Sequence, residues 1–258
     1  MNRNQVVLYV DGTWESVLTA AFDVFAHKFF PLDLRLLSNG QSDLFAATHH
    51  VVSDAKKADR VRKGLTVRDR NVYNDLWWVY LSELPGSLLL ILRAIMYYFD
   101  SVQPVNTNYQ DPRILQISNI VRSVSREKHR MKAFVRFRRL EDGVYFALIA
   151  PDFNVLPLIY RHFADRYADQ QWLIYDQKRN YGIYYDLKDV SEVYFPAAEP
   201  FKPHAVEQHD ATEEQTYDSL WKVYFSAVNI EERKNMKLHI RHVPRRYWRF
   251  LNEKTPRT

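Results

Sequence analysis

Four titratable side chains have the types and spacing that acid–base chemistry requires. Glu127 and His129 precede a predicted strand, and His162 and Asp165 lie one turn apart on a predicted helix. A histidine beside carboxylates can donate and accept protons near neutral pH, if the fold brings the groups within hydrogen-bond reach. The same residues can equally serve as ion-paired supports of a sheet. They form the candidate catalytic set, with both interpretations open.

Positive charge gathers in two segments that also carry aromatic residues. Residues 121–139 contain eight Lys or Arg and one acid, and residues 231–258 contain nine and three. Because the whole chain has a net charge of +5, the remaining residues carry about −8. Such separation favours a polyanion-binding surface, since phosphates respond to local charge. Solvated basic helix faces are the alternative.

Within and beyond these segments, arginines and lysines would hold phosphates, and a tryptophan could stack on a base. The predicted nucleic-acid contacts are Arg130, Arg136, Arg138, Lys178, Arg179, Arg245, Arg246 and Trp248.

Composition excludes several classes of site. The chain has no cysteine, which rules out disulfides, iron–sulfur clusters and cysteine nucleophiles. Six glycines argue against a Rossmann or P-loop protein. His49 and His50 are adjacent on a predicted strand and point to opposite faces, and His239 and His242 lack a carboxylate or cysteine partner. We therefore predict no metal and no cofactor.

Asp11 follows a predicted strand at 6–10 and precedes a predicted helix at 14–28. Either Asp11 or Thr13 is suited to cap that helix. An aspartate between a strand and a helix can instead bind a ligand, which is the less common use. Asp11 is therefore a cap or a ligand-binding residue.

The segment 126–195 predicts a ββαββ unit, around which the rest of the chain is arranged. Residues 133–139 and 144–150 alternate as strands do, and Asp142-Gly143 between them is typical of a two-residue hairpin loop. In that register, Arg138 lies opposite Ala147 and Arg136 opposite Ile149.

A helix begins after Pro151, with Pro157 in its first turn, where a missing N–H is harmless. A second hairpin then joins 171–176 to 183–186. We predict an α+β fold: an antiparallel sheet built on the ββαββ core, with flanking helices and a helical subdomain.

The hydrophobic pattern outside residues 126–195 predicts the domain organisation. Further elements are expected as a strand at 44–52 and helices at 55–63, 72–84, 87–99, 113–132 and 219–228. We predict a core at 1–195 with a helical insertion at about 54–130, then a linker and a basic helical segment at 196–258 packed on the core. The chain enters its first strand without a signal peptide, and the apolar window 84–99 is too short to span a membrane, so we expect a cytoplasmic protein.

Several motifs resemble a bacterial family of uncharacterised domains assigned to DNA metabolism or DNA repair. The matching motifs are YVDGTWE (9–15), VSD (52–54), KADRV (57–61), EKHRM (127–131), FVRF (134–137), PDFNVLP (151–157), HFADR (162–166), QQWLIYD (170–176) and PRRYW (244–248). Members of that family occur beside a radical-SAM protein or are fused to a uracil-DNA glycosylase domain. The resemblance implies an association with DNA repair and a radical-SAM partner, but it transfers no catalytic residue.

Three hypotheses follow from these patterns. The leading one is a DNA-repair accessory protein that binds DNA through a basic surface and works with a radical-SAM partner. The second is an enzyme that acts on a damaged base or nucleotide through the candidate catalytic set. The third is a protein-interaction scaffold without affinity for nucleic acid.

Overall fold

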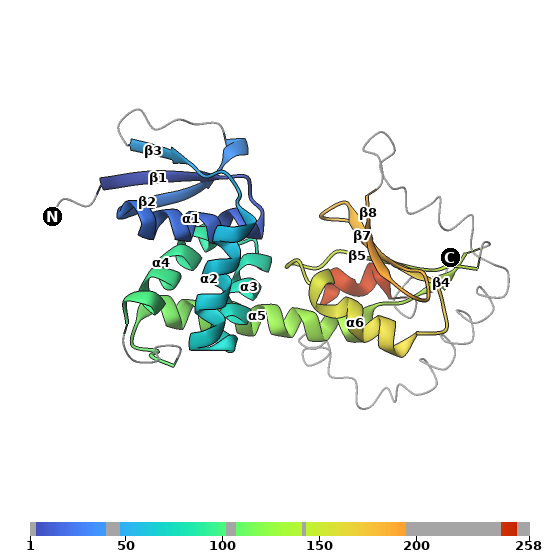
Figure 1. Ribbon diagram of the computed structural model, residues 1–258. Coiled ribbons are helices and arrows are strands. Elements are labelled where there is room, and N and C mark those ends of the chain that lie inside the picture. Colours follow the sequence, from blue (N-terminus) through green and yellow to red (C-terminus); the bar gives the residue numbers. More distant parts are fainter. Residues whose placement is uncertain (1–3, 40–46, 102–106, 141–142, 195–243, 252–258) are drawn as a thin grey trace. The chain divides into compact units, whose positions relative to one another are not determined.

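The computed structural model describes residues 4–39, 47–101, 107–140, 143–194 and 244–251 (Figure 1). The chain divides into two compact units, Met1–Ser125 and Arg126–Thr258, here called the first and the second unit. The division falls inside one long helix and not at residue 195, where the sequence suggests the end of a core. The predicted linker and the predicted helix at 219–228 lie outside the described residues.

The first unit is built on a three-stranded parallel sheet. Its strands are β1 (Asn4–Val10), β2 (Phe29–Leu36) and β3 (Ala47–His50), in the order β2-β1-β3. The central strand is buried on both faces, with Val6 to Val10 each at most 5% exposed. A central parallel strand is expected to be apolar throughout, which is why β1 reads as a continuous run and not as an alternation.

Helices fill most of the rest of the first unit. They are α1 (Trp14–His27), α2 (Ala55–Arg68), α3 (Arg70–Leu81), α4 (Ser87–Asp100) and the start of α5 (Pro112–Phe134), and a short 3₁₀ helix, η1, covers Leu37–Asn39. Within the described ranges, no helix combines the length and the apolar character needed to cross a membrane.

The sequence predicts that helix α2 ends at residue 63, just before Gly64. In the structure, α2 continues through Gly64 to Arg68. The reason is tertiary packing. A Cβ atom at Gly64 would lie 3.0 Å from the ring of Phe99, so α2 and α4 approach closely at this glycine. The missing side chain serves helix packing here and not a left-handed helix end.

The second unit contains a five-stranded sheet in the order β4-β5-β6-β7-β8. Its elements after α5 are β4 (Arg138–Arg139), β5 (Tyr145–Ile149), α6 (Leu156–Arg166), β6 (Trp172–Asp176), β7 (Tyr181–Tyr185), β8 (Val190–Val193) and the 3₁₀ helix η3 (Arg245–Phe250). All neighbouring pairs are antiparallel except β5 and β6, which α6 connects in parallel. The α+β class and the ββαββ order are confirmed, and Pro157 lies in the first turn of α6 as expected.

The first predicted strand of this unit is wrong in extent and in register. α5 continues to Phe134, and only Arg138 and Arg139 pair with β5. Arg138 lies opposite Phe146, not Ala147, because Leu140 is opposite Val144, to whose carbonyl oxygen its N–H donates at 2.9 Å. The register is therefore shifted by one position from the predicted one, which exchanges the faces of the strand.

Gly182 in β7 lies too close to β6 for a side chain to fit. A Cβ atom there would lie 2.9 Å from Leu173 Cδ1 and 3.0 Å from the carbonyl oxygen of Ile174. Because that oxygen belongs to the backbone of the neighbouring strand, we expect Gly182→Ala to destabilise the protein by about 1–3 kcal/mol. Urea unfolding should show this loss against Ser191→Ala, an exposed position on β8. Equal stability of the two variants would contradict the packing argument.

Candidate nucleic-acid interface

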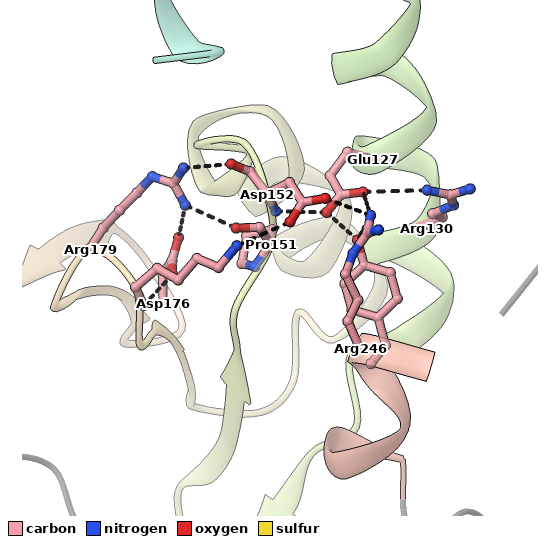
Figure 2. Close-up of polar contacts among 9 residues, drawn as sticks. Glu127, Arg130, Pro151, Asp152, Asp176, Arg179 and Arg246 are labelled. Atoms are coloured by element: carbon pink, nitrogen blue, oxygen red, sulfur yellow. Dashed lines mark hydrogen bonds and ion pairs between the residues drawn. The ribbon is translucent and has the colours of Figure 1, made fainter. Parts of the chain in front are cut away.

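Glu127 is the one acid of the basic segment 121–139, and the fold buries it. Its exposed fraction on α5 is 1%. One carboxylate oxygen accepts hydrogen bonds from the backbone N–H of Asp152, at 2.9 Å, and from the hydroxyl of Tyr247. The other oxygen lies 3.1 Å from the guanidinium of Arg246 (Figure 2). This carboxylate therefore joins α5 to the loop after β5 and to η3.

Asp152 extends the network with two more ion pairs. Its Oδ2 lies 2.8 Å from Arg246, and its Oδ1 lies 3.1 Å from the ammonium of Lys178. Arg130, one turn along α5, lies 3.7 Å from Glu127. Burial, together with Glu127, raises the pKa of Tyr247, which keeps its hydroxyl protonated as a donor.

Asp176 forms the inner end of the network. Its side chain is fully buried at the end of β6 and binds Arg179 at 2.8 Å. The same guanidinium donates to the backbone carbonyl oxygens of Pro151, at 3.3 Å, and Asp152, at 3.1 Å. Burial raises the pKa of Asp176, although Arg179 acts in the opposite direction. Figure 2 shows Arg179 reaching from this carboxylate to the loop after β5.

Four of the eight predicted nucleic-acid contacts thus bind acids of their own unit. These are Arg130, Lys178, Arg179 and Arg246. A cation paired at this distance loses much of its attraction for a phosphate outside the protein. The structure gives these residues a role in holding the unit together, and their contact with DNA stays a prediction.

The other four predicted contacts lie elsewhere. Arg136 donates to the carbonyl oxygens of Ala133, at 2.7 Å, and Val135, at 3.3 Å, and so closes the C-terminal end of α5. Arg138 lies in β4 and Trp248 lies partly exposed in η3. The side chain of Arg245 lies outside the described residues.

A different group of basic residues lies on α5 and α6. Lys128 and Lys132 lie one turn apart on α5, and His162 and Arg166 lie one turn apart on α6. Burial lowers the pKa of His162, and the charges of Lys132 and Arg166 lower it further, against the opposing effect of Asp165. Burial and Lys132 likewise lower the pKa of Lys128. Lys132 thus disfavours the charged forms of both Lys128 and His162, and Arg166 disfavours that of His162. These four residues are here called the α5–α6 basic face.

Lys128, Lys132 and Arg166 are not among the nucleic-acid contacts predicted from the sequence, although the first two stand in the basic segment at the i,i+4 spacing of one helix face. That spacing is the signal that could have found the pair. The proximity of α6 to α5 is a tertiary feature, so the sequence offers no equivalent signal for Arg166.

The candidate catalytic residues do not share one surface. Glu127 is buried while His129 is exposed, since residues two positions apart on a helix point to nearly opposite sides. His162 and Asp165 lie on α6, where Asp165 is exposed. In the described part of the chain, no hydrogen bond or ion pair joins His129, His162 and Asp165. Their catalytic role stays a prediction.

Asp11 is not the cap of α1, because Thr13 fills that position and accepts from the N–H of Ser16. Asp11 instead accepts hydrogen bonds from the backbone N–H of Thr13, at 2.8 Å, and from the hydroxyl of Ser53, at 2.8 Å. The ligand interpretation of Asp11 stays a prediction. Among the described residues, no three His, Asp or Glu side chains gather in a way that could hold a metal ion.

Comparisons with known proteins identify a family but no activity. Searches of curated proteins and of solved structures find no match. Residues 85–253 match the family model of DUF4130, a domain of unknown function, which covers more than half of the chain and every described element of the second unit. The chain therefore belongs to the DUF4130 family.

Proposed function

We propose that this protein binds DNA through the α5–α6 basic face, as a cytoplasmic accessory protein of DNA repair that works with a radical-SAM protein. The observation that carries the proposal is the position of Glu127. It is the one acid among eight basic residues in 121–139, and it points into the second unit, where Tyr247 and Arg246 bind it. Residues 121–139 themselves therefore contribute no exposed acid beside their eight basic residues.

The electrostatics of α5 and α6 support a site for a polyanion. Within the described residues, Lys132 and Arg166 form no ion pair, and Asp165 is the acid that acts on His162. Cations that depress the pKa values of their neighbours create a local positive potential, and a phosphate backbone relieves that repulsion. A DNA strand along this face would exchange its condensed counterions for these side chains.

A salt series tests the proposal. Fluorescence anisotropy with a labelled 20-base-pair duplex and the matching single strand gives the affinity between 50 and 200 mM NaCl. If Lys128, Lys132 and Arg166 each neutralise one phosphate, the logarithm of the duplex affinity should fall with a slope of about −2.7, or about 40-fold over this range. Absence of binding at 50 mM, or a slope near zero, would overturn the proposal.

The radical-SAM partnership rests on the sequence resemblance described above. We expect co-purification with a radical-SAM protein from the same genome, measured with and without nuclease. Association that survives nuclease treatment supports a direct partner. Association lost with the nucleic acid indicates that DNA alone bridges the two proteins, and that result would overturn the direct partnership.

The pH dependence of binding provides a further prediction. His162 has a pKa below the ordinary 6.5, so the face gains a charge only in acid, and a bound phosphate backbone should raise that pKa. DNA affinity should therefore rise between pH 7.5 and 5.5, with the salt slope steeper by about 0.9. His162→Gln should remove this change, while His27→Gln, in the first unit, should retain it. Identical pH profiles for the two variants would contradict a role for His162.

The same shift has a consequence for stability. Because the pKa of His162 is lower in the folded protein than in the unfolded chain, the unfolded chain binds the proton more tightly. As far as His162 is concerned, the free energy of unfolding is therefore highest above pH 6.5 and decreases as the pH falls below that value. Lowering the pH should therefore decrease the folding stability of the DNA-free protein and increase its affinity for DNA.

A further inference from the structure

The first unit holds a feature that the proposed function does not use, at the carboxyl edge of its parallel sheet. β1 lies between β2 and β3, so the strand order reverses at β1, and β1 and β3 end at the same edge (Figure 1). In open sheets with helices after parallel strands, ligands bind outside the carboxyl ends at such a reversal. The residues that follow β1 and β3 are therefore where a ligand site is expected.

Asp11 and Ser53 occupy this place. Asp11 is exposed and follows β1, and its Oδ2 accepts from the hydroxyl of Ser53, which follows β3. The hydroxyl of Ser16, with hydrogen bonds from Thr13 and Ser53, lowers the pKa of Asp11, so the group is an anion at neutral pH. Oδ1 already accepts from the N–H and the hydroxyl of Thr13. Oδ2 and the oxygen of Ser53 are thus adjacent acceptors, with lone pairs that a ligand can still use.

Aromatic rings stand beside these acceptors and remain partly exposed. Trp14 of α1 and Trp77 and Tyr80 of α3 pack against one another at centroid distances between 5.2 and 5.5 Å. The hydroxyl of Tyr80 donates to the carbonyl oxygen of Gly12 at 2.7 Å, which ties the rings to the loop of Asp11. Next to Ser53, Val52 is 80% exposed. An apolar, aromatic surface is therefore held in a defined position beside an anionic acceptor.

From this juxtaposition we infer that the first unit binds a nucleoside. The base would stack on Trp77 or Trp14, and two neighbouring sugar hydroxyls would donate to Asp11 and Ser53. The negative charge of Asp11 disfavours a phosphate at the sugar, so an uncharged nucleoside fits better than a nucleotide. This site lies in a different unit from the α5–α6 basic face, and its existence does not depend on DNA binding.

Isothermal titration calorimetry of the full chain with adenosine tests the inference, with 2′,3′-dideoxyadenosine as the matched ligand. Adenosine should give saturable binding, and the dideoxy analogue should bind about 10- to 100-fold more weakly, since the acceptors then lose their donors. Adenosine 5′-monophosphate should bind more weakly than adenosine. Absence of saturable binding by adenosine, or equal affinities for adenosine and its dideoxy analogue, would overturn the inference.

Variants tested with the same ligand locate the site on the protein. Asp11→Asn should weaken adenosine binding at least about tenfold, because a charge-assisted hydrogen bond becomes a neutral one. Trp77→Ala should weaken it by a similar factor through lost stacking. Asp59→Asn, an acid on α2 that pairs with Arg62 and Lys63, is the control and should bind as the wild type does. Circular dichroism confirms that each variant is folded, and an unchanged affinity in folded Asp11→Asn would contradict the assignment.

Discussion

Replacing Glu127 with alanine is expected to destabilise the second unit by about 3–5 kcal/mol. The substitution leaves the guanidinium of Arg246 and the hydroxyl of Tyr247 without the acceptor that they share. It also leaves the backbone N–H of Asp152 without a partner in a part-buried position. Removing one member of a buried polar network costs more than its bonds contribute, because the remaining groups keep their desolvation penalty.

Urea unfolding followed by tryptophan fluorescence measures this loss, and hydrogen exchange locates it. Amides of β5, β6 and β7 should exchange faster in Glu127→Ala, whereas those of β1 should not, since β1 belongs to the other unit. Asp169→Ala is the matched control, because Asp169 is an exposed acid of the same unit, and its effect should stay within about 0.5 kcal/mol. Equal stability of the two variants would show that Glu127 does not hold the network together.

The double charge reversal Lys132→Glu with Arg166→Glu should have the largest effect on DNA binding. Both side chains belong to the α5–α6 basic face, and neither is in an ion pair with the described residues. Removing two phosphate contacts should make the salt slope shallower by about 1.8 and weaken binding at 50 mM NaCl by at least about tenfold. Anisotropy with the same labelled duplex gives both quantities.

Two comparison variants separate this effect from a general loss of charge. Lys188→Glu changes an exposed lysine between β7 and β8, in the same unit, and should leave the slope unchanged. Asp165→Asn removes the acid that opposes Lys132 and Arg166 at His162, and should tighten binding. If Lys188→Glu weakens binding as much as the double reversal does, the attraction is unspecific and the α5–α6 basic face has no special role.

The local elements of the second unit could be predicted because their signals are local. Pro157 can occupy only the first turn of a helix, and the alternating runs around residues 177–180 define the β6–β7 hairpin. The end of α5 could not be predicted. Residues 133–139 alternate as a strand does, but the helix keeps Ala133 and Phe134, and Arg136 satisfies carbonyl oxygens at its end. Alternation over a few residues does not distinguish the last helical turn from a short strand.

The candidate interface shows a second limit of prediction from the sequence. Counting charges along the chain correctly located a basic segment, but it could not reveal which cations meet acids. Asp152 and Asp176 lie well outside that segment in sequence, yet they bind Arg246, Lys178 and Arg179 in the folded unit. Ion pairing between distant residues depends on the tertiary fold. Arg130, Lys178, Arg179 and Arg246, which the sequence predicts as DNA contacts, therefore meet acids of their own unit.

Lysine footprinting in the presence of DNA tests the central claim most directly. The wild-type protein is acetylated with and without a saturating 20-base-pair duplex at 50 mM NaCl, and mass spectrometry reads the modification of each lysine. Binding at the α5–α6 basic face predicts that DNA protects Lys128 and Lys132 while Lys178 and Lys188 react as before. Unchanged reactivity of Lys132, or protection of Lys178 and Lys188 instead, would contradict the account.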